Sequence, residues 1–343
     1  MAHRRLVVWI HSSRYPTWSI PADTLRRLGD IAGPNWDVES VEVDADAGGD
    51  GASDVPAEVL AAVEGAEIYF GFGVPADIVR RGRDLRWVHS AAAGVRSSLN
   101  GLGRAENLLF TNSAGVYGPP LAEWAIGAML YFARGFDIVT RSDDPWPYDA
   151  LAAHGHPLRE LGGSNLTIVG YGGIGAEIGR RAHALGMRVT AVRARPDRPG
   201  SEEVDRVFGP GDLAGAVADA HYVVLSLPET PETEALFDRS MLARLREDCV
   251  LLNLARGSLV DEAALIDALR GGALRGAALD VFATEPLPAG SPLLDLPNVL
   301  ATPHAGSVSP RFWERQSDLM ADNLGRYLRG EALVNLVDRR RGY

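Results

Sequence analysis

The feature that most constrains the fold is a glycine turn between a strand and a helix. Residues 170–175, Gly-Tyr-Gly-Gly-Ile-Gly, match the pattern G-x-G-x-x-G. They directly follow the apolar run Leu166–Val169 and open the helical pattern Ile174–Leu185. In this context the first glycine permits a tight turn, the second lets the backbone approach a pyrophosphate, and the third lets helix and strand pack closely. The sequence therefore predicts a dinucleotide site, with an unliganded turn as the alternative, formed by Gly170, Gly172, Gly173, Ile174 and Gly175.

Short β-type runs alternate with helical segments along the chain. In the N-terminal part, strands are expected at Leu6–Ile10, Trp36–Val43, Glu67–Phe70 and Leu85–His89. Further on, strands are expected at Leu166–Gly170, Arg188–Arg193, Tyr222–Leu227, Val250–Ala255, Ala277–Val281 and Val299–Thr302. Such alternation predicts parallel sheets with helices on both faces. The expected fold class is therefore α/β, with two doubly wound parallel-sheet domains.

The two halves are joined by a strong helical pattern at Leu121–Arg134, which we interpret as a helix crossing between domains. Asp143–His156, rich in proline and aromatic residues, predicts a long surface excursion. The last helix, about Pro310–Gly330, is expected to lead the chain back to the first domain. We therefore predict one discontinuous domain formed by residues 1–117 and 313–343, and a dinucleotide-binding domain formed by residues 118–312.

Composition excludes several classes of protein. The 34 basic residues are all arginine, so neither a lysine Schiff base nor a P-loop lysine is available. The net charge of -11 argues against nucleic acid or an anionic membrane as the main partner. The only cysteine, Cys249, adjoins an apolar run, so no thiolate metal cluster and no metal site are expected. With no apolar stretch of membrane-spanning length, we expect a cytoplasmic protein.

A basic cluster follows the second strand of the dinucleotide unit. An NAD enzyme places an acidic residue there to bind the ribose 2′-hydroxyl, but this chain has Arg193, followed by Arg195 and Arg198. Cations at that position suit a 2′-phosphate. The sequence therefore favours NADP(H) over NAD(H), with solvated surface arginines as the alternative.

Three further polar residues are expected where strands of the same unit end. Arg256, Glu285 and His304 follow the runs Val250–Ala255, Ala277–Val281 and Val299–Thr302. Doubly wound folds bind their ligands at the carboxyl ends of strands. We therefore expect the three side chains to meet at one edge of the sheet as a catalytic group. Taken singly, each could instead be a capping cation, a solvated acid or a structural histidine.

With these segments in place, the chain resembles the D-isomer-specific 2-hydroxyacid dehydrogenases over nearly its whole length. The resemblance rests on the loop Ala93-Gly94-Val95, the glycine turn, the loop Leu227–Thr233 and the three catalytic segments. It implies a flavodoxin-like substrate domain with an inserted Rossmann domain, usually in a homodimer. It also implies cofactor contacts at Leu227, Pro228, Thr233, Ala255 and Asp280, the last facing the nicotinamide amide, and backbone N–H groups of Ala93 and Gly94 that bind a substrate carboxylate.

The chemistry of 2-oxo acid reduction fits these residues. Arg256 can bind the substrate carboxylate and polarise the carbonyl, and His304 can protonate the carbonyl oxygen as the acid/base. Glu285 can orient His304 and favour its protonated form. The leading interpretation is thus an enzyme that transfers a hydride between NAD(P)H and a small 2-oxo acid or D-2-hydroxy acid, like the short glyoxylate/hydroxypyruvate reductases.

Two alternatives stay open: an NAD-linked phosphoglycerate-type dehydrogenase and a nucleotide-sensing co-repressor of the same fold. No regulatory domain is expected after Asp338, which disfavours an allosteric phosphoglycerate dehydrogenase. Glu285 stands where formate dehydrogenases carry glutamine, which disfavours that activity. Arg96 and the entry Tyr117-Gly118-Pro119-Pro120 depart from the family pattern. The substrate's side chain is therefore left open.

Overall fold

The computed structural model describes residues 3–45, 54–102, 107–153, 158–197 and 202–340. It divides into two compact units, residues 1–117 with 309–343 and residues 118–308. The predicted boundary after residue 312 therefore falls slightly later than the boundary before Ser309. The chain leaves the first unit after Tyr117 and returns to it at Ser309.

The first unit contains a five-stranded parallel sheet with the order β2-β1-β3-β4-β5. This is the strand order of flavodoxin-like folds. Its strands are β1 (Arg4–Trp9), β2 (Trp36–Ser40), β3 (Ile68–Gly71), β4 (Trp87–Ser90) and β5 (Leu109–Asn112). The short strand β5 was not among the strands expected from the sequence pattern.

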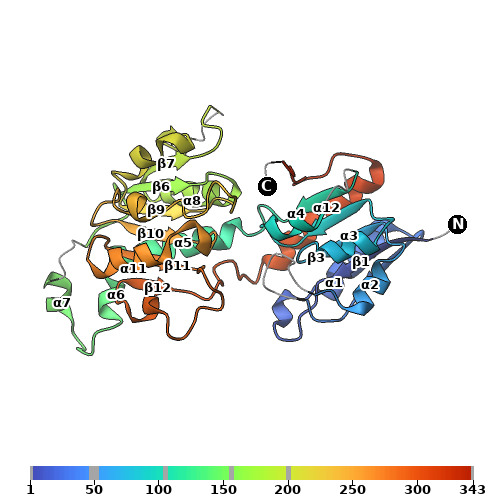
Figure 1. Ribbon diagram of the computed structural model, residues 1–343, viewed down its shortest axis with the longest axis horizontal. Helices are drawn as coiled ribbons and strands as arrows, with labels where there is room; N and C mark the ends of the chain where they lie inside the picture. The colour runs from blue at the N-terminus through green and yellow to red at the C-terminus, as the bar shows by residue number, and fades with distance from the viewer. Residues whose placement is uncertain (1–2, 46–53, 103–106, 154–157, 198–201, 341–343) are drawn as a thin grey trace. The chain divides into compact units, whose positions relative to one another are not determined.

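Helices cover both faces of this sheet because its strands are apolar on both sides (Figure 1). In β1, Leu6 and Val8 face the core below α1 (Ala22–Ala32) and α12 (Phe312–Arg329). Val7 and Trp9 belong to the opposite core. That second core is covered by α2 (Ala57–Val63), α3 (Ala76–Arg81) and α4 (Arg96–Leu102).

The second unit contains a seven-stranded parallel sheet with the order β12-β11-β10-β9-β6-β7-β8. Six of these positions follow the Rossmann order, and β12 adds a further strand at one edge. The strands are β6 (Asn165–Val169), β7 (Arg188–Val192), β8 (Arg206–Phe208), β9 (Tyr222–Leu225), β10 (Val250–Asn253), β11 (Gly276–Leu279) and β12 (Val299–Ala301). The predicted α/β class with two doubly wound parallel sheets is confirmed.

The helices of this unit pack on the sheet and on one another (Figure 1). They are α5 (Gly118–Ala133), α6 (Phe136–Val139), α7 (Tyr148–Ala153), α8 (Gly173–Ala184), α9 (Leu213–Val217), α10 (Arg239–Leu242) and α11 (Glu262–Arg270). Helices α5 and α8 contact each other along their length. The predicted excursion contains α7, and its residues 154–156 lie outside the described part of the chain.

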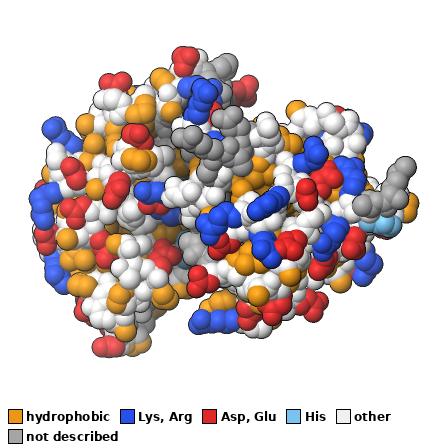
Figure 2. Space-filling view, turned by 45° about the vertical axis from the view of Figure 1, so that its right-hand side comes forward, with side chains coloured by type: hydrophobic (Ala, Val, Ile, Leu, Met, Phe, Trp, Pro, Cys, Tyr) orange, Lys and Arg blue, Asp and Glu red, His pale blue; other side chains and the backbone are white. Residues whose placement is uncertain are grey.

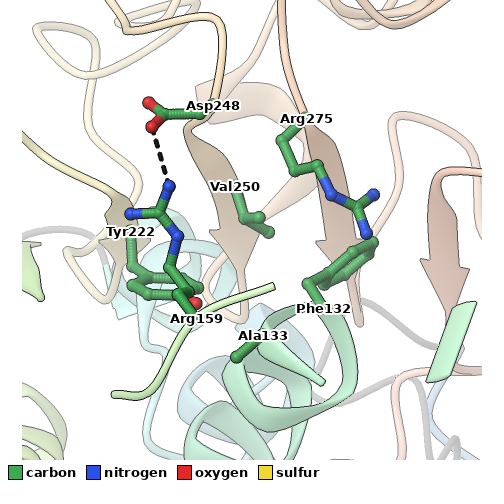
Figure 3. A pocket seen from close by; sticks show the side chains of 7 residues that line it. All are labelled: Phe132, Ala133, Arg159, Tyr222, Asp248, Val250 and Arg275. Carbon is green, nitrogen blue, oxygen red and sulfur yellow. Dashed lines mark hydrogen bonds and ion pairs between the residues drawn. The ribbon is translucent and has the colours of Figure 1, made fainter. Parts of the chain in front are cut away.

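A buried ion pair joins α6 to the amino end of β11. The guanidinium of Arg275 donates to both carboxylate oxygens of Asp137, at 2.8 and 2.9 Å. The side chains are only 7% and 3% exposed. Beside this pair, Figure 3 shows a small pocket in which Arg159 bonds to Asp248 near Tyr222. Its volume of about 10 Å³ holds one water molecule at most.

This pocket lies at the amino ends of β9, β10 and β11, where Tyr222 and Val250 are the first strand residues. In doubly wound folds the ligand sites form at the opposite, carboxyl ends. The pocket and its ion pairs therefore belong to the framework of the unit rather than to its chemistry.

Replacing Asp137 with asparagine should destabilise this unit strongly. The change leaves the Arg275 charge buried without its counter-charge, which costs about 3–5 kcal/mol in other proteins. Urea unfolding followed by circular dichroism measures the effect. As the control, Asp267→Asn breaks the exposed pair with Arg239, whose side chains are 57% and 68% exposed, and should cost about 0–1 kcal/mol. Equal midpoints for the two variants would contradict the assignment.

Candidate functional site

The glycine turn has the geometry of a phosphate-binding loop. Gly170 has φ of +96°, and a Cβ there would lie 2.6 Å from the backbone nitrogen of Leu227. A Cβ on Gly175 would lie 2.5 Å from the Gly170 carbonyl oxygen. At Gly172, by contrast, a Cβ would meet no atom within 4 Å, so the backbone is open to a ligand there. Gly173 and Ile174 begin α8, and their N–H groups have no partner within the helix. These residues fit a bound pyrophosphate.

The loop after β9 borders the glycine turn. The Ser226 hydroxyl donates to the Gly170 carbonyl at 2.9 Å, which ties the two segments together. Thr233 stabilises the same loop by donating from Oγ1 to the Pro228 carbonyl at 3.0 Å. Leu227 and Pro228 therefore lie beside the turn that the sequence assigns to the cofactor. Thr233 has its hydroxyl engaged within the loop.

The basic cluster begins immediately after β7. Arg193 is half-buried, and its Nη2 donates to the Pro196 carbonyl at 3.3 Å. Arg195 is exposed, and Arg198 lies outside the described residues. Because β6 and β7 are neighbours in the sheet, Arg193 follows the strand next to the one that ends in the glycine turn.

Three neighbouring strands carry the predicted catalytic residues. Arg256 follows β10, Glu285 follows β11 and His304 follows β12, and these strands are adjacent and parallel. Their carboxyl ends therefore share one edge of the sheet. His304 Nδ1 lies 2.7 Å from Glu285 Oε2, which makes an ion pair when the imidazole is protonated. The predicted His–Glu pair is therefore present as a direct contact.

Glu285 is held as an acceptor from two sides. Its Oε1 accepts a hydrogen bond from the Phe282 backbone N–H at 2.9 Å, while Oε2 bonds to His304. Burial acts to raise the pKa of Glu285, but these hydrogen bonds and the charges of His304 and Arg256 outweigh it and lower the pKa. The carboxylate thus stays ionised below the usual range for glutamate. Arg256 is close enough to Glu285 to contribute to this shift.

The turn that carries Arg256 is built by Asn253, the last residue of β10. Asn253 Nδ2 donates to the Arg256 carbonyl at 2.8 Å, and its Oδ1 accepts from the Ala255 N–H at 3.1 Å. Arg256 Nη1 donates to the Ala255 carbonyl at 2.7 Å. Asn253 was not singled out in the sequence, although an asparagine that ends an apolar strand is a usual signal for such a turn.

Asp280 occupies the carboxyl end of β11 and is 1% exposed. Its carboxylate accepts hydrogen bonds from Thr302, Ala305 and Gly306, all close to His304 in the chain. Burial raises the pKa of Asp280 and these bonds oppose the rise. The family resemblance implies that Asp280 faces the nicotinamide amide, and its contacts within this unit connect it to the loop that carries His304.

In the first unit, the backbone carbonyls at the end of β4 and in the loop after it accept hydrogen bonds from a neighbouring segment. Four consecutive carbonyls, at residues 90–93, accept hydrogen bonds from the segment Asn112–Tyr117. The donors are Ser113 Oγ to Ser90 at 3.0 Å, the Tyr117 hydroxyl to Ala91, Ser113 N to Ala92 at 3.1 Å and Asn112 Nδ2 to Ala93 at 2.7 Å. Ala93 and Gly94 are partly exposed, while Ala91, Ala92 and Val95 are buried. Their fixed peptide planes suit N–H groups that serve as donors.

Sequence reasoning did not find these anchors. It treated Tyr117 only as a departure from the family pattern, whereas the structure buries its ring and bonds its hydroxyl to Ala91. Asn112 ends β5, the strand that the sequence pattern did not reveal, and Ser113 follows it.

In the part of the chain that the structure describes, no three His, Cys, Asp or Glu side chains gather closely enough to hold a metal ion. Among the same residues, no helix has the length and apolar character needed to cross a membrane.

The two parallel sheets and the glycine turn define a dinucleotide-binding protein. Comparison with known proteins specifies its family. Residues 126–306, more than half of the chain, match the NAD-binding domain of D-isomer-specific 2-hydroxyacid dehydrogenases. Glycerate dehydrogenase of Methylorubrum extorquens is 31% identical over 285 residues, covering 80% of this chain and 87% of that protein. Glyoxylate reductase of Korarchaeum cryptofilum is 32% identical over 269 residues, covering 77% and 80%.

Among solved structures, a D-isomer-specific 2-hydroxyacid dehydrogenase from Xanthobacter autotrophicus Py2, in complex with NADPH and MES, is similar over 100% of both chains. Its TM-score is 0.79 at 30% identity. The chain belongs to the D-isomer-specific 2-hydroxyacid dehydrogenase family. It is an NAD(P)-dependent enzyme that transfers a hydride between the nicotinamide and a 2-oxo acid or 2-hydroxy acid, as the sequence predicts.

Proposed function

We propose that this chain is an NADPH-dependent reductase of small 2-oxo acids of the glyoxylate and hydroxypyruvate class, with His304 as the proton donor. The observation that carries the proposal is the 2.7 Å contact between His304 Nδ1 and Glu285 Oε2 at the ligand-binding edge of the Rossmann sheet. We assign cofactor binding to residues 118–308 and substrate binding to the other unit, through Ala93 and Gly94.

The roles of the residues follow from their chemistry. Because Nδ1 of His304 is held by Glu285, the proton delivered to the carbonyl oxygen sits on Nε2. Arg256 binds the substrate carboxylate with its planar fork and polarises the neighbouring carbonyl. The bound nicotinamide supplies the hydride. The turn Gly170–Gly175 and the N-terminus of α8 hold the pyrophosphate.

A panel of 2-oxo acids tests this function directly. The purified protein is assayed with glyoxylate, hydroxypyruvate, 3-phosphohydroxypyruvate and bulkier 2-oxo acids, each with NADPH and with NADH. The rate is measured as the loss of absorbance of the reduced nicotinamide. We expect the highest kcat/KM for a small unphosphorylated acid with NADPH. No turnover with any substrate would favour a nucleotide-sensing binding protein, and a preference for the phosphorylated acid with NADH would favour the phosphoglycerate-type activity.

The preference for NADPH rests on Arg193 and Arg195, which replace the acidic residue of NAD enzymes after β7. Arg193→Asp should lower the affinity for NADPH by roughly tenfold to more than a hundredfold, because it removes attraction and adds repulsion. NADH, which has only a 2′-hydroxyl, should bind at least as well as before. The measurement is the NADPH/NADH ratio of kcat/KM at two salt concentrations, since salt weakens the preference of the parent.

The matched control is Arg239→Asp in α10, which changes the net charge equally at an exposed position. It should leave the cofactor ratio unchanged. If Arg193→Asp behaves like this control, the arginines after β7 are solvated surface residues.

We propose a homodimer as the assembly, and the proposal rests on exposed apolar side chains in residues 130–158, from the last turn of α5 to the segment before β6. Leu130, Phe136, Val139, Trp146, Tyr148 and Leu158 are 38–80% exposed, with Trp146 the most exposed. Helix α7, drawn in green in Figure 1, extends away from the sheet of its unit. Exposed large apolar side chains that gather in one surface patch mark protein contacts, and this segment supplies six of them. Basic and acidic side chains are instead interspersed on the face shown in Figure 2, which does not suit nucleic acid.

Sedimentation analysis tests the dimer. The parent and the control Leu294→Asp, which changes an exposed leucine outside this segment, should sediment as dimers, while Trp146→Asp with Tyr148→Asp should sediment as a monomer. A monomeric parent, or a dimer that survives both changes, would contradict the proposal. We also propose that the protein is cytoplasmic, since it uses the nicotinamide cofactors of the cytoplasm.

A further inference from the structure

The residues on both sides of His304 are bonded to one buried carboxylate. Asp280 Oδ1 accepts from the Thr302 hydroxyl at 2.6 Å and from the Ala305 N–H at 2.9 Å. Oδ2 accepts from the Gly306 N–H at 2.9 Å. Because Asp280 is 1% exposed, water does not compete effectively for these positions. The Asp280 side chain, directly after β11, therefore fixes the loop after β12 before and after His304.

The backbone of this loop needs such a restraint. His304 has φ of +51°, in the left-handed region that residues other than glycine rarely adopt. Its N–H donates to the Thr302 carbonyl at 3.0 Å, which closes a tight turn. A conformation of this kind persists only where the surrounding structure enforces it. The hydrogen bonds to Asp280 supply that enforcement.

A tryptophan on α5 extends the network. The indole Nε1–H of Trp124 donates to Thr302 Oγ1 at 3.1 Å. Since the hydroxyl of Thr302 has a single proton, accepting from Trp124 leaves that proton for Asp280. The hydrogen bonds therefore run in one direction, from Trp124 through Thr302 to Asp280.

The packing around Asp280 leaves no spare room. A Cβ on Gly306 would lie 2.9 Å from Asp280 Oδ2 and 3.2 Å from side-chain carbons of Leu121 and Trp124. Movement of the loop would therefore displace the carboxylate or α5. The loop, the carboxylate and the helix form one interlocked arrangement within this unit.

We propose that Trp124, Thr302 and Asp280 are positioning residues that hold the His304 loop so that Nδ1 stays on Glu285 and Nε2 keeps its place for proton delivery. The inference rests on the proposed role of His304. It gives Asp280 a task that does not depend on contact with the nicotinamide amide. It also gives functions to Trp124 and Thr302, which the sequence analysis treats as helix and strand residues.

Thr302→Val is the central test because it removes the hydroxyl and keeps the shape of the side chain. The kcat for 2-oxo acid reduction should fall about tenfold to a hundredfold, as misplacement of a catalytic group by about 1 Å does. The Kd of NADPH, measured by its fluorescence, and the KM of the substrate should stay within about twofold of the parent, since neither ligand loses a contact. Thr302→Ser should restore most of the activity, and Trp124→Phe should give a smaller loss.

Two further readouts separate positioning from a general loss of stability. The solvent deuterium isotope effect on kcat should rise in Thr302→Val, because proton transfer becomes more rate-limiting. Hydrogen exchange followed by mass spectrometry should show faster exchange at residues 303–308, where Ala305 and Gly306 lose restraint. The matched control is Thr167→Val in β6, which removes another buried hydroxyl bond, from Thr167 to the Ala216 carbonyl at 2.8 Å. It should leave kcat and the isotope effect unchanged.

His304→Gln distinguishes failure of this inference from failure of the proposed function. If His304→Gln stays active, the proton-donor role fails. If His304→Gln is inactive but Thr302→Val keeps the parent's kcat, isotope effect and exchange rates, the positioning network is overturned while the proton-donor role stands. A loss in Thr302→Val that appears only as weaker NADPH binding would likewise overturn it, because it assigns the network to the cofactor.

Discussion

Replacing His304 with glutamine should abolish most 2-oxo acid reduction, with a loss in kcat of about a hundredfold to ten-thousandfold. Glutamine keeps a polar group of similar size, but it cannot deliver a proton to the carbonyl oxygen. The Kd of NADPH should change little, because the residues assigned to the phosphates of the cofactor follow β6 and β7 rather than β12. Steady-state kinetics with a fluorescence titration of NADPH measure both quantities. A variant with nearly parental kcat would exclude His304 as the donor.

Glu285→Gln tests the partner of His304 through the pH profile. A neighbouring negative charge stabilises an imidazolium. The Glu285 carboxylate lies in hydrogen-bond contact with His304 Nδ1, at 2.7 Å. Glutamine removes the charge that pairs with the protonated imidazole, so the pH above which reduction declines should move to lower pH. In the parent, the lowered pKa of Glu285 keeps this carboxylate ionised as the pH falls through the usual range of glutamate. An unchanged profile would remove the pair from the mechanism.

Arg256→Lys should cost about 2–4 kcal/mol of transition-state binding, or roughly thirtyfold to several hundredfold in kcat/KM. An ammonium group keeps the charge but cannot reproduce the bidentate contact of a guanidinium with a carboxylate. Simple aldehydes lack the carboxylate, so their reduction should be affected much less. The comparison of kcat/KM for glyoxylate and for an aldehyde provides its own control. Equal losses on both substrates would assign Arg256 to the structure of the turn after β10.

Much of the fold could be predicted because its strands are apolar runs between helical patterns. The glycine turn identified β6 and α8, and the restart of the alternation identified the second sheet. Two strands escaped prediction for physical reasons. In β5, Leu109–Asn112, polar residues occupy half of a four-residue strand, and β8, Arg206–Phe208, is a three-residue edge strand. Strand β12 is equally short and also lies at an edge, but it was predicted because all its residues are apolar, whereas neither β5 nor β8 is a continuous apolar run.

The candidate site was predictable to the extent that it depends on strand ends. Arg256, Glu285 and His304 follow three parallel strands, so their common edge follows from topology. The contacts of Asp280 could not be anticipated in the same way, since they depend on the left-handed backbone of His304. Likewise, Trp124 lies at a helical spacing typical of core residues. Only the packed structure brings its indole nitrogen to Thr302.

The way in which the loop after β4 is anchored has a consequence for how the enzyme can diversify. Each of its four carbonyls is bonded by the segment Asn112–Tyr117, and none of these bonds uses a side chain of Ala91, Ala92, Ala93 or Gly94. The main chain of the loop is thus fixed by residues outside the loop, and Ala93 is partly exposed. A larger side chain at position 93 is therefore compatible with this main-chain conformation, because the hydrogen bonds that fix it come from the segment Asn112–Tyr117.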